Sequence, residues 1–277
     1  MTDWVSLHTV GIVAVGVGSG VLSALAGVGG AVVSTPGIRA LGASPIVSVG
    51  STVPAIIPGA ITGTIRYAKQ GLVDWRVGLG VGSAGAVSAL GGAWLSDHVD
   101  GRILMVLTAF LVLWSSLSVL GRRSAPVPEP ATSSNLRRNV GSEPEFPRKF
   151  GGERAPVALL IAMGFGAGLI AGLLGVGGGI VLVPAFTTLL GLEVKETIAT
   201  SLVAVAMMST TSLIGHVLEG HVHWAYALPL VIGVVPGARI GSKIAVAASQ
   251  QTMRLVCGWL LLVLGLIYLA TELSRLV

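Results

Sequence analysis

The residues best placed to do chemistry in this sequence are glycines inside an apolar run. The segment GLLGVGGGIVLVP at residues 172–184 contains Gly177, Gly178 and Gly179 in succession. Glycine tolerates the backbone angles of a sharp turn and weakens a helix, so we expect a helix to break here. A helix that restarts after the break presents free N–H groups and the positive end of its dipole, which suits an anion. The segment therefore predicts anion binding by backbone groups.

The same pattern is present nearer the N-terminus. LAGVGGAVVSTP (25–36) and LLGVGGGIVLVP (173–184) agree at seven of twelve positions at an offset of 148, and GLVDW (71–75) and GHVHW (220–224) follow at an offset of 149. Short helices are expected to begin near Ala31 and Ile180. Hydroxyl side chains at matching places in the two halves add further donors. The predicted substrate-binding residues are Gly29, Gly30, Ala31, Ser51, Thr52, Gly177, Gly178, Gly179, Thr200 and Ser201.

Close packing is the competing interpretation of such glycines. Gly164, Gly168 and Gly172 recur at four-residue intervals, a spacing that membrane helices use where their backbones approach each other. Serine and threonine in helices also often bond to carbonyls of their own helix. The functional interpretation is favoured because the break recurs at the same place in both halves and is followed each time by a proline.

Composition places these segments in a membrane. Of the 277 residues, 53% are hydrophobic and 10% are charged, and the mean hydropathy is +0.87. These values are typical of a multi-pass integral membrane protein, whose partner is the lipid bilayer. The net charge of +5 agrees with the collection of Lys and Arg in cytoplasmic loops, so nucleic-acid binding is not indicated. The single cysteine, Cys257, excludes an intramolecular disulfide and a CxxC motif.

Each half opens with an apolar stretch that is too long for one membrane crossing. Val5–Leu41 and Pro156–Leu192 each contain 37 residues, which as one helix would be about 55 Å long against roughly 30 Å of hydrocarbon. Each stretch is therefore expected to fold back at its glycines, and three ordinary spans follow it. These spans are expected near 44–66, 75–96 and 102–120, and near 194–216, 224–247 and 253–272.

The two halves are separated by a stretch of different composition. Residues 122–155 are rich in proline, serine and charge, which is typical of a flexible linker. The predicted organisation is therefore membrane repeat 1 (1–121), the linker (122–155) and membrane repeat 2 (156–277).

Loop charges give the expected orientation. If the basic linker is cytoplasmic, the loop with Arg66 and Lys69 and the segment near Lys243 are cytoplasmic too. The loop with Asp97 and the segment HVLEGHVH (216–223) then face outward, and both termini are periplasmic. The two halves consequently have opposite orientations. The predicted fold is an all-α integral membrane protein with two inverted-topology repeats, each a re-entrant, broken helical hairpin at a GVGG motif plus three transmembrane helices.

Other motifs do not indicate an enzyme. GAGLIA (166–171) lacks an acidic ribose partner, GVGGG is not followed by Lys-Ser or Lys-Thr, and no G-x-S-x-G elbow occurs. His216, His221 and His223 could bind a metal or sense pH, but polar side chains at the membrane interface are the favoured interpretation. Every Asp and Glu falls in a predicted loop, in the linker or near a terminus, so no coupling-ion site is visible. No catalytic residue, metal or cofactor is predicted.

The doubled L-x-G-V-G-G pattern followed by proline, the two four-element halves and the hydrophilic central linker resemble the sulfite exporter TauE/SafE family of membrane transporters. The resemblance covers nearly the whole chain outside the linker. It implies secondary transport, with export as the expected direction, of small sulfur-containing anions such as sulfite, sulfoacetate or other organosulfonates across the bacterial cytoplasmic (inner) membrane. The first copy departs from the pattern at Ala31, where the second has Gly179.

Alternating access at a midplane site between the repeats is the expected mechanism. A passive anion channel and a carboxylate permease of the same architecture are the alternatives, and a scaffold without transport is a third. The sequence leaves open the exact substrate, the direction of transport, any coupling ion and the oligomeric state, for which a homodimer is one option. It also assigns no role to the linker or to the three histidines.

Overall fold

The computed structural model describes residues 2–121 and 156–273, and every regular element in these two segments is helical. The predicted linker lies outside the described residues and stays a prediction. A π-helical turn, η1 (Phe186–Leu190), continues helix α7. The helices are α1 (Thr2–Ala26), α2 (Ala31–Ala40), α3 (Pro45–Ala68), α4 (Trp75–Asp97), α5 (Gly101–Leu120), α6 (Val157–Leu174), α7 (Gly179–Ala185), α8 (Val194–Leu218), α9 (Trp224–Ala247) and α10 (Gln250–Leu273).

Eight of the described helices are long and apolar enough to cross a membrane. They are α1, over His8–Ala26, together with α3, α4, α5, α6, α8, α9 and α10. Their outer faces carry large apolar side chains such as Trp94, Phe110 and Trp259, each of which is more than half exposed in the isolated chain. In a bilayer these faces are covered by lipid, while helices satisfy the backbone hydrogen bonds internally. The prediction of an all-helical, multi-pass membrane protein is confirmed.

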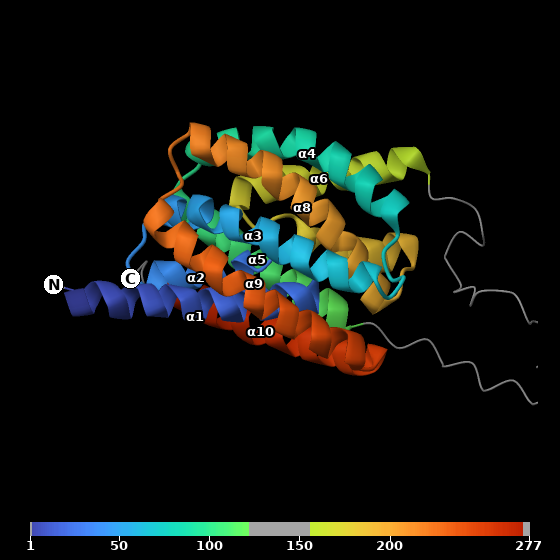
Figure 1. Ribbon diagram of the computed structural model, residues 1–277. Helices are drawn as coiled ribbons and strands as arrows, with labels where there is room; N and C mark the ends of the chain where they lie inside the picture. The colour runs from blue at the N-terminus through green and yellow to red at the C-terminus, as the bar shows by residue number, and fades with distance from the viewer. Residues whose placement is uncertain (1, 122–155, 274–277) are drawn as a thin grey trace, which may run out of the picture.

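The two described segments, 2–121 and 156–273, each begin and end at opposite ends of the bundle. Figure 1 shows the start of α1 and the end of α10 on the left, and the end of α5 and the start of α6 on the right. On the left, His221 Nε2 lies 3.1 Å from Asp97 Oδ1, joining the α8–α9 turn to the end of α4. On the right, Lys195 Nζ donates to Val246 O at 2.9 Å, joining the start of α8 to the end of α9.

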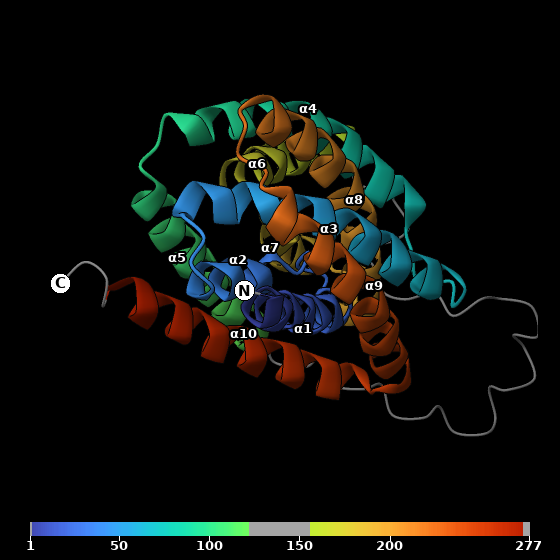
Figure 2. The same ribbon diagram turned by 60° about the vertical axis from the view of Figure 1, so that its left-hand side comes forward.

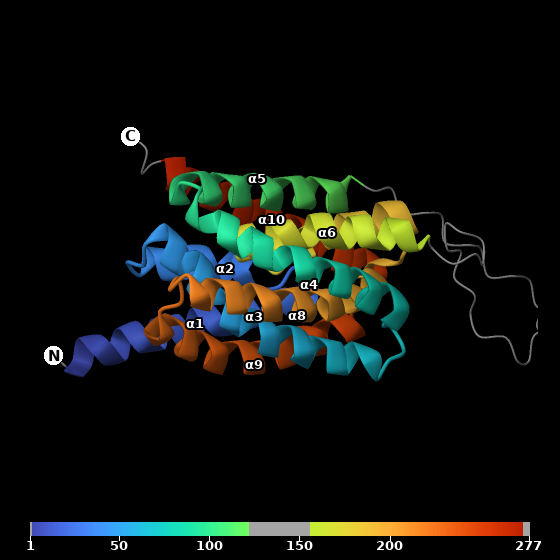
Figure 3. The same ribbon diagram turned by 90° about the horizontal axis from the view of Figure 1, so that it is seen from above.

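Helices of the two halves are interleaved (Figures 2 and 3). Helix α1 packs mainly on α9, and α6 on α4, while α3 packs on α8 and α5 on α10. A side chain at Gly164, Gly168 or Gly172 would collide with the backbone of α4, and one at Gly16 or Gly20 with the backbone of α9. The four-residue glycine spacing of α6 is therefore a close-packing surface, as its spacing indicated.

Local sequence explains where several helices begin. Pro45 lies in the first turn of α3, where its missing N–H costs nothing. Asp74 Oδ1 accepts a hydrogen bond from Val77 N at the start of α4, and Asp100 Oδ1 accepts one from Arg102 N at the start of α5. These caps stabilise turns at the ends of the bundle. The breaks between α1 and α2 and between α6 and α7 lie instead in its buried interior.

Candidate functional site

Both glycine segments form the same kind of turn inside the bundle. Only glycine adopts left-handed backbone angles readily, and these occur at matching positions: φ is +69°, +96° and +76° at Gly27, Gly29 and Gly30, and +63°, +79° and +75° at Gly175, Gly177 and Gly178. Helix α2 begins at Ala31, as predicted, and α7 begins one residue before the predicted start at Ile180. The two GVGG motifs thus break their helices in the same way.

The two turns lie against each other. A Cβ built on Gly29 would stand only 2.7 Å from Val176 O, and one on Gly179 would collide with Gly27 O. Ile56 of α3 and Val205 of α8 each contact both turns, because their methyl carbons would lie within 3.5 Å of a Cβ on Gly29 or on Gly177. The glycines therefore allow two backbone segments from opposite halves of the chain to meet at one point.

The starts of α2 and α7 present unpaired N–H groups at this point. Val33 N and Ser34 N bond to Gly30 O, and Val181 N and Leu182 N bond to Gly178 O. In the described part of the chain, no hydrogen bond is donated by the preceding amides at residues 29–32 and 177–180. Such groups carry the partial positive charge of a helix start and can bind an anion. Helix α7 continues through η1, so the apolar helix after the second turn spans Gly179–Leu190.

Two buried hydroxyls that have no hydrogen-bond partner among the described residues lie beside the turns. Ser209 Oγ would stand 3.0 Å from a Cβ on Gly177, and Ser23 Cβ would stand 3.2 Å from one on Gly30. Neither hydroxyl makes a hydrogen bond to any described residue, and both side chains are at most 2% exposed. Leaving a buried hydroxyl unpaired costs free energy, so such a group is a candidate to bind a ligand.

The hydroxyls predicted from the sequence are all buried but have different roles in the fold. Ser201 Oγ lies 3.0 Å from Gly27 O, directly at the first turn. Thr52 Oγ1 bonds to the carbonyl of Val49 on its own helix. Ser51 and Thr200 instead accept bonds from backbone N–H groups at the starts of α9 and α4, as the distances Ser51 Oγ to His223 N (2.8 Å) and Thr200 Oγ1 to Asp74 N (3.0 Å) show.

The structure thus brings the six predicted backbone positions and Ser201 together at the turns. Ser51 and Thr200 lie at the joints between the halves. Sequence reasoning left out Ile56 and Val205, which touch both turns. These two residues are separated by 149 positions, the offset that also relates Ser51 to Thr200, so the repeat spacing contained the signal that could have identified them.

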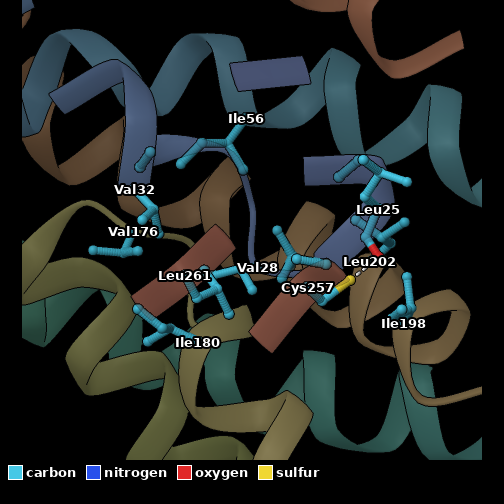
Figure 4. Packing of buried hydrophobic residues seen from close by; sticks show 14 of the residues in the cluster. Leu25, Val28, Val32, Ile56, Val176, Ile180, Ile198, Leu202, Cys257 and Leu261 are labelled. Carbon is cyan, nitrogen blue, oxygen red and sulfur yellow. Dashed lines mark hydrogen bonds between the residues drawn. The ribbon is translucent and has the colours of Figure 1, made fainter. Parts of the chain in front are cut away.

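Apolar side chains close the space around the turns. Val28, Val176, Ile56 and Ile180 are no more than 3% exposed and belong to one cluster with residues of α8 and α10. Figure 4 shows these residues pointing toward one another from several helices. In the same cluster, Cys257 Sγ donates a hydrogen bond to Leu25 O at 3.0 Å. An apolar pocket nearby, beside Ala26, has room for a water molecule but not for an organic anion. The N–H groups are therefore shut off from solvent in this conformation.

The polar groups around the two turns are distributed unevenly. Ser19 Oγ donates to Gly30 O at 2.8 Å, and Ser23 lies one helical turn further along α1. At the positions 148 residues later, α6 carries Ala167 and Ala171. Among the described residues, no Asp, Glu, Lys or Arg side chain is buried, and the buried polar groups belong to Ser, Thr, His, Tyr and Cys side chains. The site therefore has hydroxyls and backbone dipoles but no buried charged side chain.

The histidines differ from their expected place. Residues 216–223 are predicted to form an outer loop, but α8 continues to Leu218 and His216 is fully buried in its last turn. Its Nε2 lies 2.9 Å from Gly172 O of α6, a contact that the sequence alone does not reveal. No group of three His, Cys, Asp or Glu side chains suited to a metal is present in the described segments.

These features define a class: a multi-pass helical membrane protein in which two broken helices meet at a buried, anion-compatible backbone site. The chain belongs to the TauE/SafE family, because the family described as "Sulfite exporter TauE/SafE" matches residues 12–268. It is accordingly a member of a membrane transporter family and not an enzyme.

Curated relatives match over most of their length. The "Probable membrane transporter protein YunE" of Bacillus subtilis (strain 168) is 28% identical over 262 residues, covering 92% of this chain and 94% of the relative. The "Probable membrane transporter protein YfcA" of Escherichia coli (strain K12) is 26% identical over 239 residues, covering 85% and 80%. A "Probable membrane transporter protein" of Xylella fastidiosa (strain Temecula1) is 26% identical over 262 residues. No solved structure gives a significant match to the chain.

Proposed function

We propose that this protein is a secondary transporter that exports small sulfur-containing anions, such as sulfite, sulfoacetate or other organosulfonates, from the bacterial cytoplasm. The family's description supports the substrate class. The observation that carries the proposal is the meeting of two buried glycine turns, each with amides, at residues 29–32 and 177–180, that donate no hydrogen bond within the described part of the chain. An anion held there needs no buried Lys or Arg.

In this proposal, the backbone of the predicted glycine positions and Ala31 holds the anion. Ser201 contributes a hydroxyl beside Gly27, and Thr52 lies on the matching helix. Ser51 and Thr200 support the site indirectly, since they hold the starts of α9 and α4. Ser209 adds an unpaired donor beside Gly177.

Matching contacts support the proposal that residues 1–121 and 156–277 are inverted repeats. The Ser51–His223 bond corresponds to the Thr200–Asp74 bond when each position is shifted by 149 and the halves are exchanged. Tyr67 Oη donates to Ala24 O at 2.7 Å, and the corresponding contact in the other half is His216 Nε2 to Gly172 O. The packing of α1 on α9 and of α6 on α4 follows the same exchange. Such repeats commonly form transporter sites at their interface.

The proposed cycle is a rocking of the two repeats about the turns. In the described conformation, Val28, Val176 and Ile56 are buried in one apolar cluster at the turns. Separation of the halves at one end would uncover the N–H groups of the turns to one side of the membrane, and separation at the other end to the opposite side. The anion would be released when its N–H contacts are exposed to water, which competes for the same donors.

Counterflow is the experiment that tests this function. Proteoliposomes preloaded with unlabelled sulfoacetate or sulfite are expected to accumulate labelled anion transiently above its external concentration, because a carrier exchanges substrates across its cycle. A passive channel would only equilibrate the label. A scaffold would give no uptake above protein-free liposomes, and a carboxylate permease would show counterflow with short carboxylates in place of the sulfur compounds.

Replacing Ser209 with alanine is expected to weaken anion binding several-fold, by about 1 kcal/mol, because a donor in the site is lost. The same change should raise the free energy of unfolding of the substrate-free protein, since it removes an unpaired buried hydroxyl. Titration calorimetry with sulfite and sulfoacetate measures the first effect and thermal unfolding the second. Ser115→Ala is the matched control, because Ser115 Oγ on α5 is also buried and makes no hydrogen bond within the described segments. If both variants kept the parent's affinity, Ser209 would have no role in binding.

We also propose that both termini are periplasmic and the linker cytoplasmic. The start of α1 and the end of α10 lie at one end of the bundle, opposite the end of α5 and the start of α6, which supports opposite sides for the termini and the linker (Figure 1). The basic residues Arg66, Lys69 and Lys243 favour the cytoplasm for the linker side. In a Cys257→Ser background, the exposed positions Gln70 and Glu219 can each be changed to cysteine. An impermeant thiol reagent added outside spheroplasts is expected to label Glu219→Cys and not Gln70→Cys. The reverse pattern would invert the orientation.

A further inference from the structure

A chain of polar contacts runs from the surface to α6 at one end of the bundle. Asp97 Oδ1 lies 3.1 Å from His221 Nε2, His221 Nδ1 lies 3.2 Å from His216 Nδ1, and His216 Nε2 lies 2.9 Å from Gly172 O. We call Asp97, His221 and His216 the imidazole chain. The side chain of Asp97 is 51% exposed and that of His221 is 7% exposed, whereas His216 is fully buried.

Counting hydrogens shows what the imidazole chain must hold. Gly172 O can only accept, so His216 donates from Nε2. A neutral His216 then has a lone pair on Nδ1, and His221 must donate to it from Nδ1. A neutral His221 would therefore turn the lone pair of its Nε2 toward the Asp97 carboxylate, which also has only lone pairs.

The third contact consequently requires one more proton. It can be bonded to His221 Nε2 or to Asp97 Oδ1, and in both placements the imidazole chain holds one proton more than two neutral histidines and a carboxylate. Solvent reaches this proton through Asp97. The arrangement is thus a site for one exchangeable proton.

The matching place in the other half contains no such site. Tyr67 donates to Ala24 O through a hydroxyl, and the equivalent of His221 there is Leu72. A single O–H is sufficient to support the backbone carbonyl at this position. The second half therefore has more than the first half needs at this position, namely Nδ1 of His216 and its contacts with His221 and Asp97.

The neighbouring elements contribute few other titratable groups. Helix α6 and the first half of α3, which packs on His221 through Gly50, contain none. The remaining groups at this end make no hydrogen bond to either imidazole among the described residues. They include His98 at the end of α4, Asp100 and Arg102 at the α4–α5 turn, Glu219 and His223 around the α8–α9 turn, and Tyr226, whose ring is tilted against the rings of His223 and His8.

We infer that the imidazole chain is a proton-binding site that holds this end of the molecule closed. The Asp97–His221 contact joins the first half of the chain to the second, so it must break if the halves separate at this end. With the proton bound, all three contacts are hydrogen bonds; without it, His221 has one N–H for its two contacts, and when that hydrogen stays on Nδ1, two lone pairs face each other at Asp97. The contact therefore stabilises the closed arrangement at low pH and loses that effect as the pH rises.

This inference uses the proposed transport only for its functional consequence: protons on that side of the membrane would slow the opening step. Asp97→Asn is the decisive variant, because an amide N–H can donate to the neutral His221 and keep the contact at every pH. Asp97→Ala removes the contact at every pH. His98→Gln is the control, since His98 is adjacent to Asp97 but bonds to Trp94 O.

Thermal unfolding of the purified, substrate-free protein is measured from about pH 5 to about pH 9, the range that brackets histidine titration. Relative to Asp97→Asn, the parent is expected to lose about 2–4 °C of unfolding midpoint as the pH rises, and His98→Gln should behave like the parent. Parallel profiles for the parent and Asp97→Asn would overturn the proton site.

Counterflow then tests the consequence. The counterflow rate of the parent is expected to rise as the pH on this face rises. The rate of Asp97→Asn should stay low, and the rate of Asp97→Ala should stay high, at every pH. Equal pH dependence in all three would contradict control of opening by the proton. Absence of counterflow from the parent at every pH would count against transport itself, and the unfolding midpoints, which need no substrate, would still decide whether the proton site exists.

Discussion

Gly177→Ala is expected to reduce counterflow at least about tenfold while leaving the protein folded. Gly177 has φ of +79°, and a Cβ there would lie 3.0 to 3.2 Å from Ser209 Oγ, Val205 Cγ1 and Ile56 Cγ2. Alanine in this backbone conformation costs only about 1–2 kcal/mol, which a folded membrane protein tolerates. The three neighbouring atoms belong to side chains that must give way by a few tenths of an ångström. Because these side chains are buried, we expect the turn to shift as well, and that shift misaligns the N–H groups that we propose bind the anion.

Gly71→Ala separates the backbone cost from the crowding. Gly71 lies in the α3–α4 turn with φ of +68°, and a Cβ there meets nothing within 4 Å. It should lower the unfolding midpoint no more than Gly177→Ala does, because it has the backbone cost alone, and it should leave counterflow unchanged. If Gly177→Ala transported as well as Gly71→Ala, the glycine turns would be structural features only.

Gly168→Val is expected to lower the free energy of unfolding by at least about 3 kcal/mol, because overpacking against a backbone cannot be relieved by a side-chain rotation. A side chain at Gly168 collides with the carbonyl of Gly85 and with Ser88 Oγ on α4. The two helices would have to move apart along their whole contact. Unfolding by a denaturing detergent, followed by helical circular dichroism, gives the change.

Gly166→Val supplies the comparison for this helix. Gly166 is exposed on α6, two residues from Gly168, and a Cβ there meets nothing within 4 Å. Both variants add the same side chain to the same helix, so the difference between them measures the α4–α6 contact alone. Equal stability of the two would be incompatible with the close approach described.

Glycine patterns made much of this fold predictable. The paired GVGG motifs give the helix breaks because left-handed backbone angles at Gly29 and Gly177 require residues without a Cβ. The four-residue spacing around Gly168 gives a packing face because small residues on one side of a helix let another backbone approach. Both inferences depend only on local geometry, which a sequence determines well.

Contacts between residues far apart in the sequence were harder to predict. His216 lies near the end of a predicted span, and the sequence alone does not reveal that it is buried with its Nε2 bonded to Gly172 O, 44 residues away. Matching positions showed that Ser51 and Thr200 are equivalent, but not that their hydroxyls accept bonds from His223 and Asp74. The direction of a hydroxyl depends on how its helix is rotated in the bundle, and packing of the whole chain determines that rotation.

The uneven distribution of serine around the two turns would determine the orientation of a bound ligand. Two identical halves would treat both ends of a guest molecule alike. Ser19 and Ser23 lie beside one turn, and Ala167 and Ala171 occupy the same places beside the other. The interior is therefore more polar at the first turn and more apolar at the second. A ligand with one ionised group and an apolar hydrocarbon part would bind there in a single orientation. A small ion such as sulfite has no apolar part, so the difference between the two turns would not orient it.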